Sequence, residues 1–181
     1  MQLAHRKSHP ILFSSEMVRA ILDGSKTQTR RIVKLPDNRD NWKDHALLKC
    51  PYGQVDERLW VRETWCRMSH SHECIGYKAD KICKCGHFFA SEPERWKPSI
   101  HMRREYSRLT LKITDVSIER LQDISDVDAM AEGVKLHDNT VTHYQGQYVD
   151  GFQVLWESIH GTDSWAINPW VYAVSFERLK F

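Results

Sequence analysis

The segment 23–31, DGSKTQTRR, holds residue types that could contact a nucleotide phosphate. A phosphate-binding loop needs an early Gly and a second Gly directly before the Lys. Here Ser25 separates Gly24 from Lys26, and Arg19 stands where the early Gly belongs. Without that Gly the backbone cannot easily wrap a phosphate with its N–H groups. The spacing therefore argues against an ATP or GTP site.

A second group of reactive side chains occupies segment 70–87, HSHECIGYKADKICKCGH. Cys and His are the ligands of tetrahedral zinc sites. The candidate ligands of a structural zinc ion are Cys74, Cys83, Cys85 and His87, with His70 and His72 as further nitrogen donors. The C-x-C spacing is tighter than the usual C-x₂₋₄-C. The alternative is a polar surface insertion with free thiols.

Segment 95–112, RWKPSIHMRREYSRLTLK, is rich in Lys and Arg, with Trp96 and Tyr106 between them. Cations contact phosphates while aromatic rings stack on bases, so the pattern is typical of an RNA-binding surface. Arg103 and Arg104 are the candidate contacts. Among the tryptophans, Trp65 is the candidate for stacking on a base. The alternative is a solvated strand face with core aromatics.

Charge is unevenly distributed along the 181 residues, although the net charge is only +2. Residues 1–112 hold 22 Lys and Arg against 13 Asp and Glu, whereas residues 113–164 hold 2 against 10. A basic part can present a positive face to a polyanion. Equally, the two parts can attract each other within one fold.

Composition indicates an ordinary globular chain, with 41% hydrophobic residues and room for a sizeable core. No apolar run approaches the roughly 20 residues that span a bilayer, and the N-terminus lacks the apolar stretch of a signal peptide. The five cysteines, an odd number, favour a reducing cytoplasm. Cys50 and Cys66 are expected as buried thiols. We expect no membrane partner.

Periodicity predicts the order β-α-β-β-β-β-α-α-β. The expected strands are 11–14, 27–33, 56–66, 75–79, 107–121 and 170–179, and the expected helices are 14–24, 124–134 and 152–161. A bulge is expected at Thr114–Asp115. Ser125 and Asp128 form the pattern of a capping box, and Gly24 and Gly133 fit helix ends. Residues 36–41 are a turn cluster.

These elements predict an α+β fold: a small, mixed, mostly antiparallel β-barrel with helices at its ends. Rossmann fingerprints are absent, and only the first helix could be a βαβ crossover. We expect a single domain over residues 1–181, with a Cys/His-rich insertion at about 67–94 and a shorter one at about 137–150.

The G-x-K-x-x-T-x-R pattern of residues 24–31 resembles the signature of ASCH domains, which belong to the PUA-like superfamily. Further similar segments are ERLWVRETW (57–65), RWKPSIHM (95–102), LQDISDVDAMAEGV (121–134) and NPWVYAVSFE (168–177). Together they resemble ASCH proteins of bacterial and prophage genomes. The resemblance implies a small PUA-like β-barrel with a cleft beside the first helix, and a link to RNA or modified nucleosides.

One branch of that family hydrolyses the N4-acyl amide of acetylated cytidine with a Lys, a Thr and a Glu. The resemblance carries these roles to Lys26, Thr29 and Glu132. Thr29 would attack if a neighbour took its proton. Lys26 could be that base if burial, or the cations Arg30 and Arg31, lowered its pKa. Glu132 would hold a water or protonate the leaving nitrogen.

Three readings of function follow. The first is a protein that binds a nucleoside or RNA in a cleft lined by Lys26, Thr29, Arg31 and Glu132, and hydrolyses an N4-acylcytidine as an amidohydrolase without a required cofactor. The second is a reader of RNA or modified bases without catalysis, or a ribonuclease. The third is an interaction module whose fold is held together by a zinc ion. Each of the three candidate catalytic residues also has a purely structural interpretation. Lys26 would be a solvated lysine, Thr29 a strand-forming residue, and Glu132 a helix-end carboxylate paired with Arg31.

Overall fold

The computed structural model describes residues 7–34, 42–68, 71–89, 93, 95–135 and 146–180, without the side chains of 71–73. A five-stranded sheet runs in the order β1-β3-β6-β7-β2. Its strands are β1 (Ser8–Leu12), β2 (Gln28–Ile32), β3 (Arg58–Arg62), β6 (Thr110–Arg120) and β7 (Trp170–Leu179). The β1–β3 pair is parallel and the other three pairs are antiparallel. The expected α+β, mixed and mostly antiparallel architecture is confirmed.

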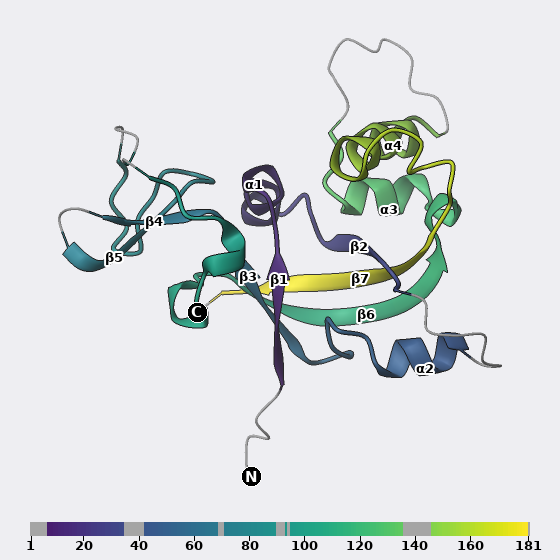
Figure 1. Ribbon diagram of the computed structural model, residues 1–181, viewed down its shortest axis with the longest axis horizontal. Coiled ribbons are helices and arrows are strands. Elements are labelled where there is room, and N and C mark those ends of the chain that lie inside the picture. Colours follow the sequence, from purple (N-terminus) through teal and green to yellow (C-terminus); the bar gives the residue numbers. More distant parts are fainter. Residues whose placement is uncertain are drawn as a thin grey trace.

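The sheet is curved but open. Figure 1 shows β6 and β7 as long bent strands at its centre, with β1 and β2 at the two edges. Among the residues described, no backbone pairing joins β1 to β2, so the barrel is not closed by hydrogen bonds. The bulge expected in the longest strand is present, because the β6–β7 register shifts between Ile113 and Asp115.

Helix α1 (Ser15–Asp23) connects the two edge strands. The Ser14 hydroxyl caps it by accepting a hydrogen bond from Met17 N, and the helix ends at Gly24, whose φ is 85°. Val18 and Ile21, on the apolar face of this helix, are buried. Since β1 and β2 lie at opposite edges, α1 is not a crossover between neighbouring strands; the parallel partner of β1 is β3.

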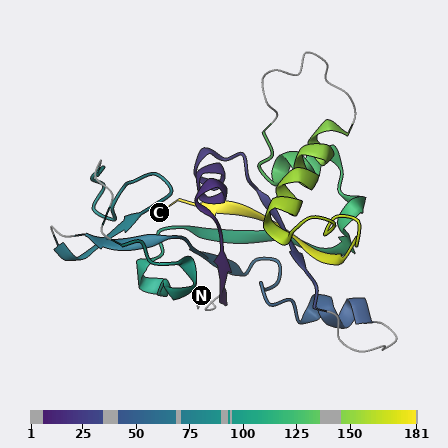
Figure 2. The same ribbon diagram turned by 45° about the horizontal axis from the view of Figure 1, so that its top comes forward.

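Helices α3 (Asp126–Ala131) and α4 (Gln147–His160) pack against each other. Figures 1 and 2 both place them together above the β2 and β7 end of the sheet. The capping box between Ser125 and Asp128 is confirmed. A second apolar cluster, separate from the core of the main sheet, lies beneath these helices and consists of Leu121, Ile124, Ala129, Phe152, Trp156 and Val171.

Several predicted bounds are wrong. The expected strand 56–66 divides into β3 and β4 (Trp65–Met68), and β4 pairs with β5 (Ser71–Tyr77) in a separate two-stranded sheet. The division falls at Glu63, whose carboxylate binds Arg108. Helix α2 (Trp42–Leu48) was not expected, and α4 begins before 152.

Two further expectations lie outside the described residues: the turn at 36–41, and most of the insertion at about 137–150. No helix in the described part of the chain is both long and apolar enough to cross a membrane.

Candidate functional site

Lys26 and Glu132 form a buried ion pair. Lys26 lies two residues before the first residue of β2, and Glu132 is the C-cap of α3. The Lys26 ammonium donates to Glu132 Oε2 at 2.6 Å and to the Glu132 carbonyl oxygen at 2.8 Å. The two side chains are only 1% and 4% exposed. Burial lowers the pKa of Lys26, and the Glu132 carboxylate opposes that shift.

Gly133 permits this close approach of α3 to Lys26. Its φ of 86° lies in the left-handed region. A Cβ atom there would lie 3.2 Å from the Cβ atoms of both Ala20 and Lys26. The glycine that the sequence marks as a helix end therefore also lets the ends of α1 and α3 meet.

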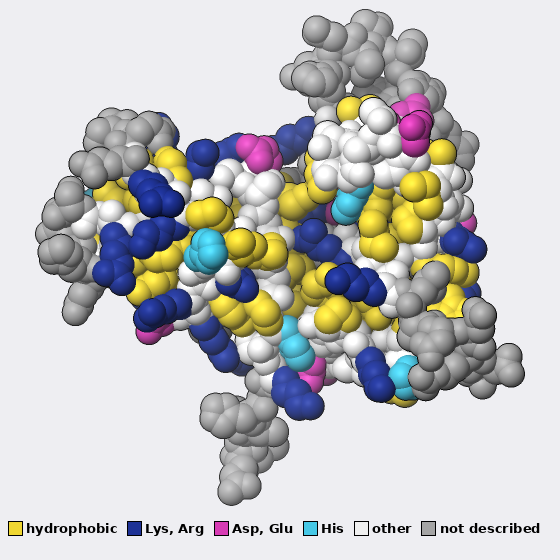
Figure 3. Space-filling model, in the orientation of Figure 1, with side chains coloured by type: hydrophobic (Ala, Val, Ile, Leu, Met, Phe, Trp, Pro, Cys, Tyr) yellow, Lys and Arg dark blue, Asp and Glu magenta, His cyan; other side chains and the backbone are white. Residues whose placement is uncertain are grey.

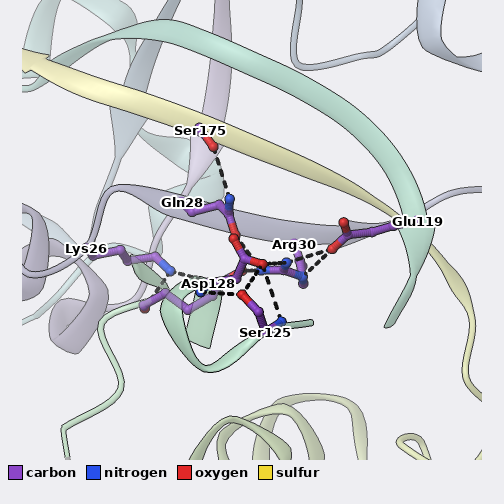
Figure 4. A network of polar contacts seen from close by, with 8 residues as sticks. Lys26, Gln28, Arg30, Glu119, Ser125, Asp128 and Ser175 are labelled. Carbon is purple, nitrogen blue, oxygen red and sulfur yellow. Dashed lines mark hydrogen bonds and ion pairs between the residues drawn. The ribbon is translucent and has the colours of Figure 1, made fainter. Parts of the chain in front are cut away.

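Arg30 extends the pair into a network, shown in Figure 4. Its guanidinium donates to Glu119 Oε1 at 2.9 and 2.6 Å, and to Gln28 Oε1 at 2.5 Å. It also lies 3.4 Å from Glu132 and 3.6 Å from Asp128. With its side chain 1% exposed, Arg30 binds carboxylates of this chain.

This network bears on the uneven distribution of charge along the sequence. Glu119, Asp128 and Glu132 come from the acidic part of the sequence, whereas Lys26 and Arg30 come from the basic part. The two parts thus attract each other inside the fold. The alternative in which Glu132 pairs with Arg31 differs from the structure, because the ion pairs of Glu132 are with Lys26 and Arg30.

Thr29 lies within the β2–β7 ladder. It is 2% exposed and pairs with Val174 in the β2–β7 ladder. Side chains alternate along a strand, so Thr29 points to the face opposite Gln28 and Arg30. The structure therefore brings together two of the three residues implied for amide hydrolysis.

A cavity of about 640 Å³ lies between α1 and α4. In Figure 3 the surface is hollowed between these helices. Its lining includes Phe13, Met17, Arg31, Thr64, Ser99, Glu132, Leu155, Ser158 and Ile159, but neither Lys26 nor Thr29. Lys26 lies behind this wall: its Nζ atom is 5.9 Å from the centre of the Phe13 ring.

Arg31 is the cation of the cavity wall. Its guanidinium donates to the Leu12 carbonyl oxygen at 2.7 Å and lies 5.4 Å from the Phe13 ring centre. Burial lowers its pKa, opposed by the charges of Tyr52 and Glu132. No carboxylate in the described part of the chain forms an ion pair with Arg31, so its charge is available to a ligand.

A basic groove lies next to this cavity, with a volume of about 470 Å³. It is lined by Trp65, Arg67, Arg95, Lys97, Pro98, His101, Arg103 and Tyr106. None of these described lining residues is acidic. Figure 3 shows Lys and Arg side chains gathered over β4 and β5. The backbones of Trp65 and Lys97 pair, and both residues line the groove, while the nearby Thr64 and Ser99 line the cavity. Neighbouring residues of the same two segments therefore line the two hollows.

The predicted RNA-contacting residues take different places in this groove. Arg103 lines it, whereas Arg104 is exposed outside the lining. Trp65 forms its floor, is 3% exposed, and packs against Tyr106 at 4.8 Å between ring centres. Tyr106 is half-buried and is the more accessible ring. The sequence did not identify Arg67 and Lys97 as groove residues, because they line the groove only when β4 folds beside residues 95–97.

Arg108 and Glu63 are also residues that sequence reasoning missed. The guanidinium makes two bonds of 2.9 Å to the buried Glu63 carboxylate and one of 2.7 Å to Asp80. Burial raises the pKa of Glu63 against the effect of Arg108. This pairing fastens the start of β4 to the segment before β6. The ERLWVRETW pattern contains Glu63 but gives no sign of its distant partner.

The cysteines of the insertion meet. The sulfur atoms of Cys74, Cys83 and Cys85 lie within 4.8 Å of one another, a group that could hold a metal ion. His87 Nδ1 lies 3.4 Å from Cys85 Sγ. His70 and the side chain of His72 are outside the described residues. Cys50 and Cys66 are buried and form no disulfide, as expected.

No protein-family model and no curated protein matches this sequence. Among solved structures, the chain is similar to an ASCH domain from Lactobacillus crispatus JV V101 (TM-score 0.47, 11% identity, 95% of this chain and 79% of that chain covered). It is also similar to protein EF3133 from Enterococcus faecalis V583 (TM-score 0.42, 12% identity, 94% and 80% covered). At this overlap and identity, neither similarity carries an argument about function.

Proposed function

We propose that this protein binds single-stranded RNA, with one base in the cavity between α1 and α4 and the neighbouring phosphates in the basic groove. The observation that carries the proposal is that neighbouring residues line the two hollows: Thr64 and Ser99 line the cavity, and Trp65, Lys97 and Pro98 line the groove. One strand of RNA could therefore pass from one hollow to the other.

The cavity offers contacts suited to a nucleobase. Arg31 supplies N–H donors and Glu132 supplies carboxylate acceptors, while Phe13, Leu155 and Ile159 supply apolar surface. A base presents donors and acceptors on its edge and apolar faces above and below. The volume of about 640 Å³ falls in the usual range for small-molecule sites.

The groove offers contacts suited to a phosphate backbone. Arg67, Arg95, Lys97 and Arg103 provide positive charge, and Tyr106 provides a ring on which a neighbouring base can stack. Lys26 and Arg30 bind buried or partly buried carboxylates of the chain, whereas these cations lie in a lining without acidic side chains among the described residues. Arg103 pairs at 3.5 Å with Glu105, which is exposed outside that lining. The resemblance of residues 24–31 to ASCH proteins points to RNA as well.

The test is equilibrium titration of fluorescent single-stranded RNA at several salt concentrations. We expect the logarithm of the affinity to fall linearly with that of the salt concentration, with a slope of about −0.7 per phosphate contact. The double variant Arg67→Ala, Lys97→Ala should bind more weakly and show a shallower slope.

Lys34→Ala with Lys49→Ala is the matched control, because it removes the same charge from positions just after β2 and α2, and neither residue lines the groove. Equal losses in both double variants would show non-specific attraction and contradict the proposed groove. Binding that does not change with salt would also contradict it.

Hydrolysis of an N4-acylcytidine amide is a second candidate, favoured by the contact between Lys26 and Glu132. Such a reaction would consume one water, break the acyl C–N bond, and release a carboxylic acid and cytidine. Glu132 lines the cavity, but Thr29 and Lys26 do not. Binding is therefore the better-supported function, and catalysis would require the wall around Phe13 to open.

Mass-spectrometric detection of cytidine released from N4-acetylcytidine tests this candidate. Glu132→Gln should abolish release if the carboxylate takes part in proton transfer. Thr29→Val removes the hydroxyl at nearly constant volume, so full activity in a folded Thr29→Val protein would exclude Thr29 as the nucleophile. No product from the wild type would leave binding as the function.

We propose the cytoplasm as the site of action, because five cysteines, an odd number, cannot all pair in disulfides, and unpaired thiols persist in reducing compartments.

A further inference from the structure

Three cysteines of the insertion converge although they come from two segments. Cys74 lies on β5, while Cys83 and Cys85 lie on the loop that follows it. Cys85 Sγ is 2.9 Å from Cys74 Sγ and 3.0 Å from Cys83 Sγ. His87 Nδ1 is 3.4 Å from Cys85 Sγ. Four side chains of the types that bind zinc are therefore gathered at one place.

The backbone of the loop builds this arrangement. Cys83 forms a bridge with Gly76 of β5, and its N–H donates to the His87 carbonyl oxygen at 2.9 Å. Gly86 N donates to the Cys83 carbonyl oxygen at 2.8 Å, closing a tight turn. Gly86 has a φ of 85°, which favours glycine. The turn explains how a C-x-C-G-H segment places three potential ligands together despite its short spacing.

A small cavity adjoins the cluster. Its volume is about 260 Å³, and it is lined by Met68, Cys83, His87, Phe88 and Phe89. Cys83 and His87 face it together, and the other three side chains are apolar. Cys74 and Cys83 are buried, whereas Cys85 and His87 are exposed, so an ion can reach the cluster from solvent.

We propose that Cys74, Cys83, Cys85 and His87 bind one zinc ion, which fastens the loop 82–88 to β5. Zinc bonds of about 2.3 Å to tetrahedral sulfurs place those sulfurs about 3.8 Å apart, so the three side chains move outward as the ion enters. Each bound thiol loses its proton to solvent, so three protons leave as the ion binds. His87 binds as a neutral ring through one nitrogen.

The ion would also stabilise one wall of the basic groove. Lys84, between two of the ligands, donates to the Glu105 carbonyl oxygen at 3.0 Å. Glu105 lies between Arg103 and Tyr106, which line the groove. A loop fixed by zinc would thereby hold this segment in place. The metal's role is structural, since all four ligand positions are taken by protein.

Metal analysis of protein purified without chelator is the direct test. We expect stoichiometric zinc in the wild type, lost in Cys83→Ser and in His87→Ala. Cys50→Ser should retain it, because Cys50 is a buried free thiol outside the cluster. His87→Cys should also retain zinc, which keeps the test informative if the other variants fold poorly. Replacement by cobalt should give the absorption bands of tetrahedral thiolate coordination.

Two results would overturn the proposal. The first is wild-type protein without metal, even after incubation with zinc, in which all five thiols react with a thiol reagent. The second is a mass lower by two hydrogens, which would show a disulfide between Cys85 and one of its two neighbours. These readouts do not depend on RNA, so failure of the zinc site and failure of the proposed function are distinguishable.

Discussion

The Lys26 ammonium lies 2.6 Å from Glu132 Oε2, and this contact joins the start of β2 to the end of α3 across 106 residues of sequence. A second bond, from the same ammonium to the Glu132 carbonyl oxygen, fixes the backbone at that point. Glu132 lines the cavity whereas Lys26 does not, so the ion pair lies behind the cavity wall. Its first role is therefore to hold the site together.

Loss of Lys26 should destabilise the protein strongly. Lys26→Met leaves the Glu132 carboxylate buried with only the longer Arg30 contact, and breaking a buried pair typically costs about 3–5 kcal/mol. We expect a loss of about 3 kcal/mol in the free energy of unfolding, measured with urea. Lys26→Met with Glu132→Leu should recover part of that loss, and a double variant as unstable as the single one would contradict this explanation.

Substitution of Gly133 should separate backbone strain from crowding. Gly133→Ala forces a side chain into a left-handed conformation, at a cost of about 1–2 kcal/mol, and brings its Cβ against Ala20 and Lys26 at 3.2 Å. Gly24→Ala is the matched control, because Gly24 has a similar φ of 85° with no atom within 4 Å of the added Cβ. The melting temperature should fall further for Gly133→Ala. Equal shifts would show that crowding contributes nothing.

A bulky side chain at the mouth of the cavity should block the base site. Ile159 is an exposed residue of α4 that lines the cavity, so Ile159→Trp should weaken binding of a free nucleoside or of RNA at least several-fold. Val154→Trp is the control, since Val154 is exposed on the same helix but outside the lining. Calorimetric titration compares the two. Unchanged affinity in Ile159→Trp would place the base elsewhere.

Asp128 should contribute to stability in a way that disappears in acid. Burial raises its pKa, but hydrogen bonds from Ser125 and the charge of Arg30 outweigh this, so the folded pKa lies below the ordinary 3.8. The carboxylate therefore stabilises the fold above that ordinary value, and the contribution is lost as the pH falls through the lower folded pKa. Melting temperatures of wild type and Asp128→Asn should converge between about pH 5 and pH 2. A constant difference across that range would contradict the shift.

Local patterns were sufficient to predict several elements. Ser14 and Gly24 bound α1, Ser125 and Asp128 start α3, and alternation through 170–179 predicts β7, because caps and side-chain periodicity depend only on near neighbours. No local pattern predicted the break in the strand expected at 56–66. At the break, the Glu63 carboxylate binds Arg108, which lies 45 residues away in the sequence.

The same distinction between local and long-range information applies to the candidate site. The sequence by itself determined which residues carry chemistry: Lys26 beside its Thr and Arg neighbours, the basic run of 95–112, and the Cys/His spacing of 74–87. Only the tertiary structure decided which of them meet. Lys26 reaches Glu132 because α3 returns to the start of β2. Thr29 lies on the face of β2 opposite Gln28 and Arg30 because strand side chains alternate, and Arg67 joins Lys97 because β4 leaves the main sheet. These outcomes depend on long-range pairing, which residue spacing along the chain does not encode.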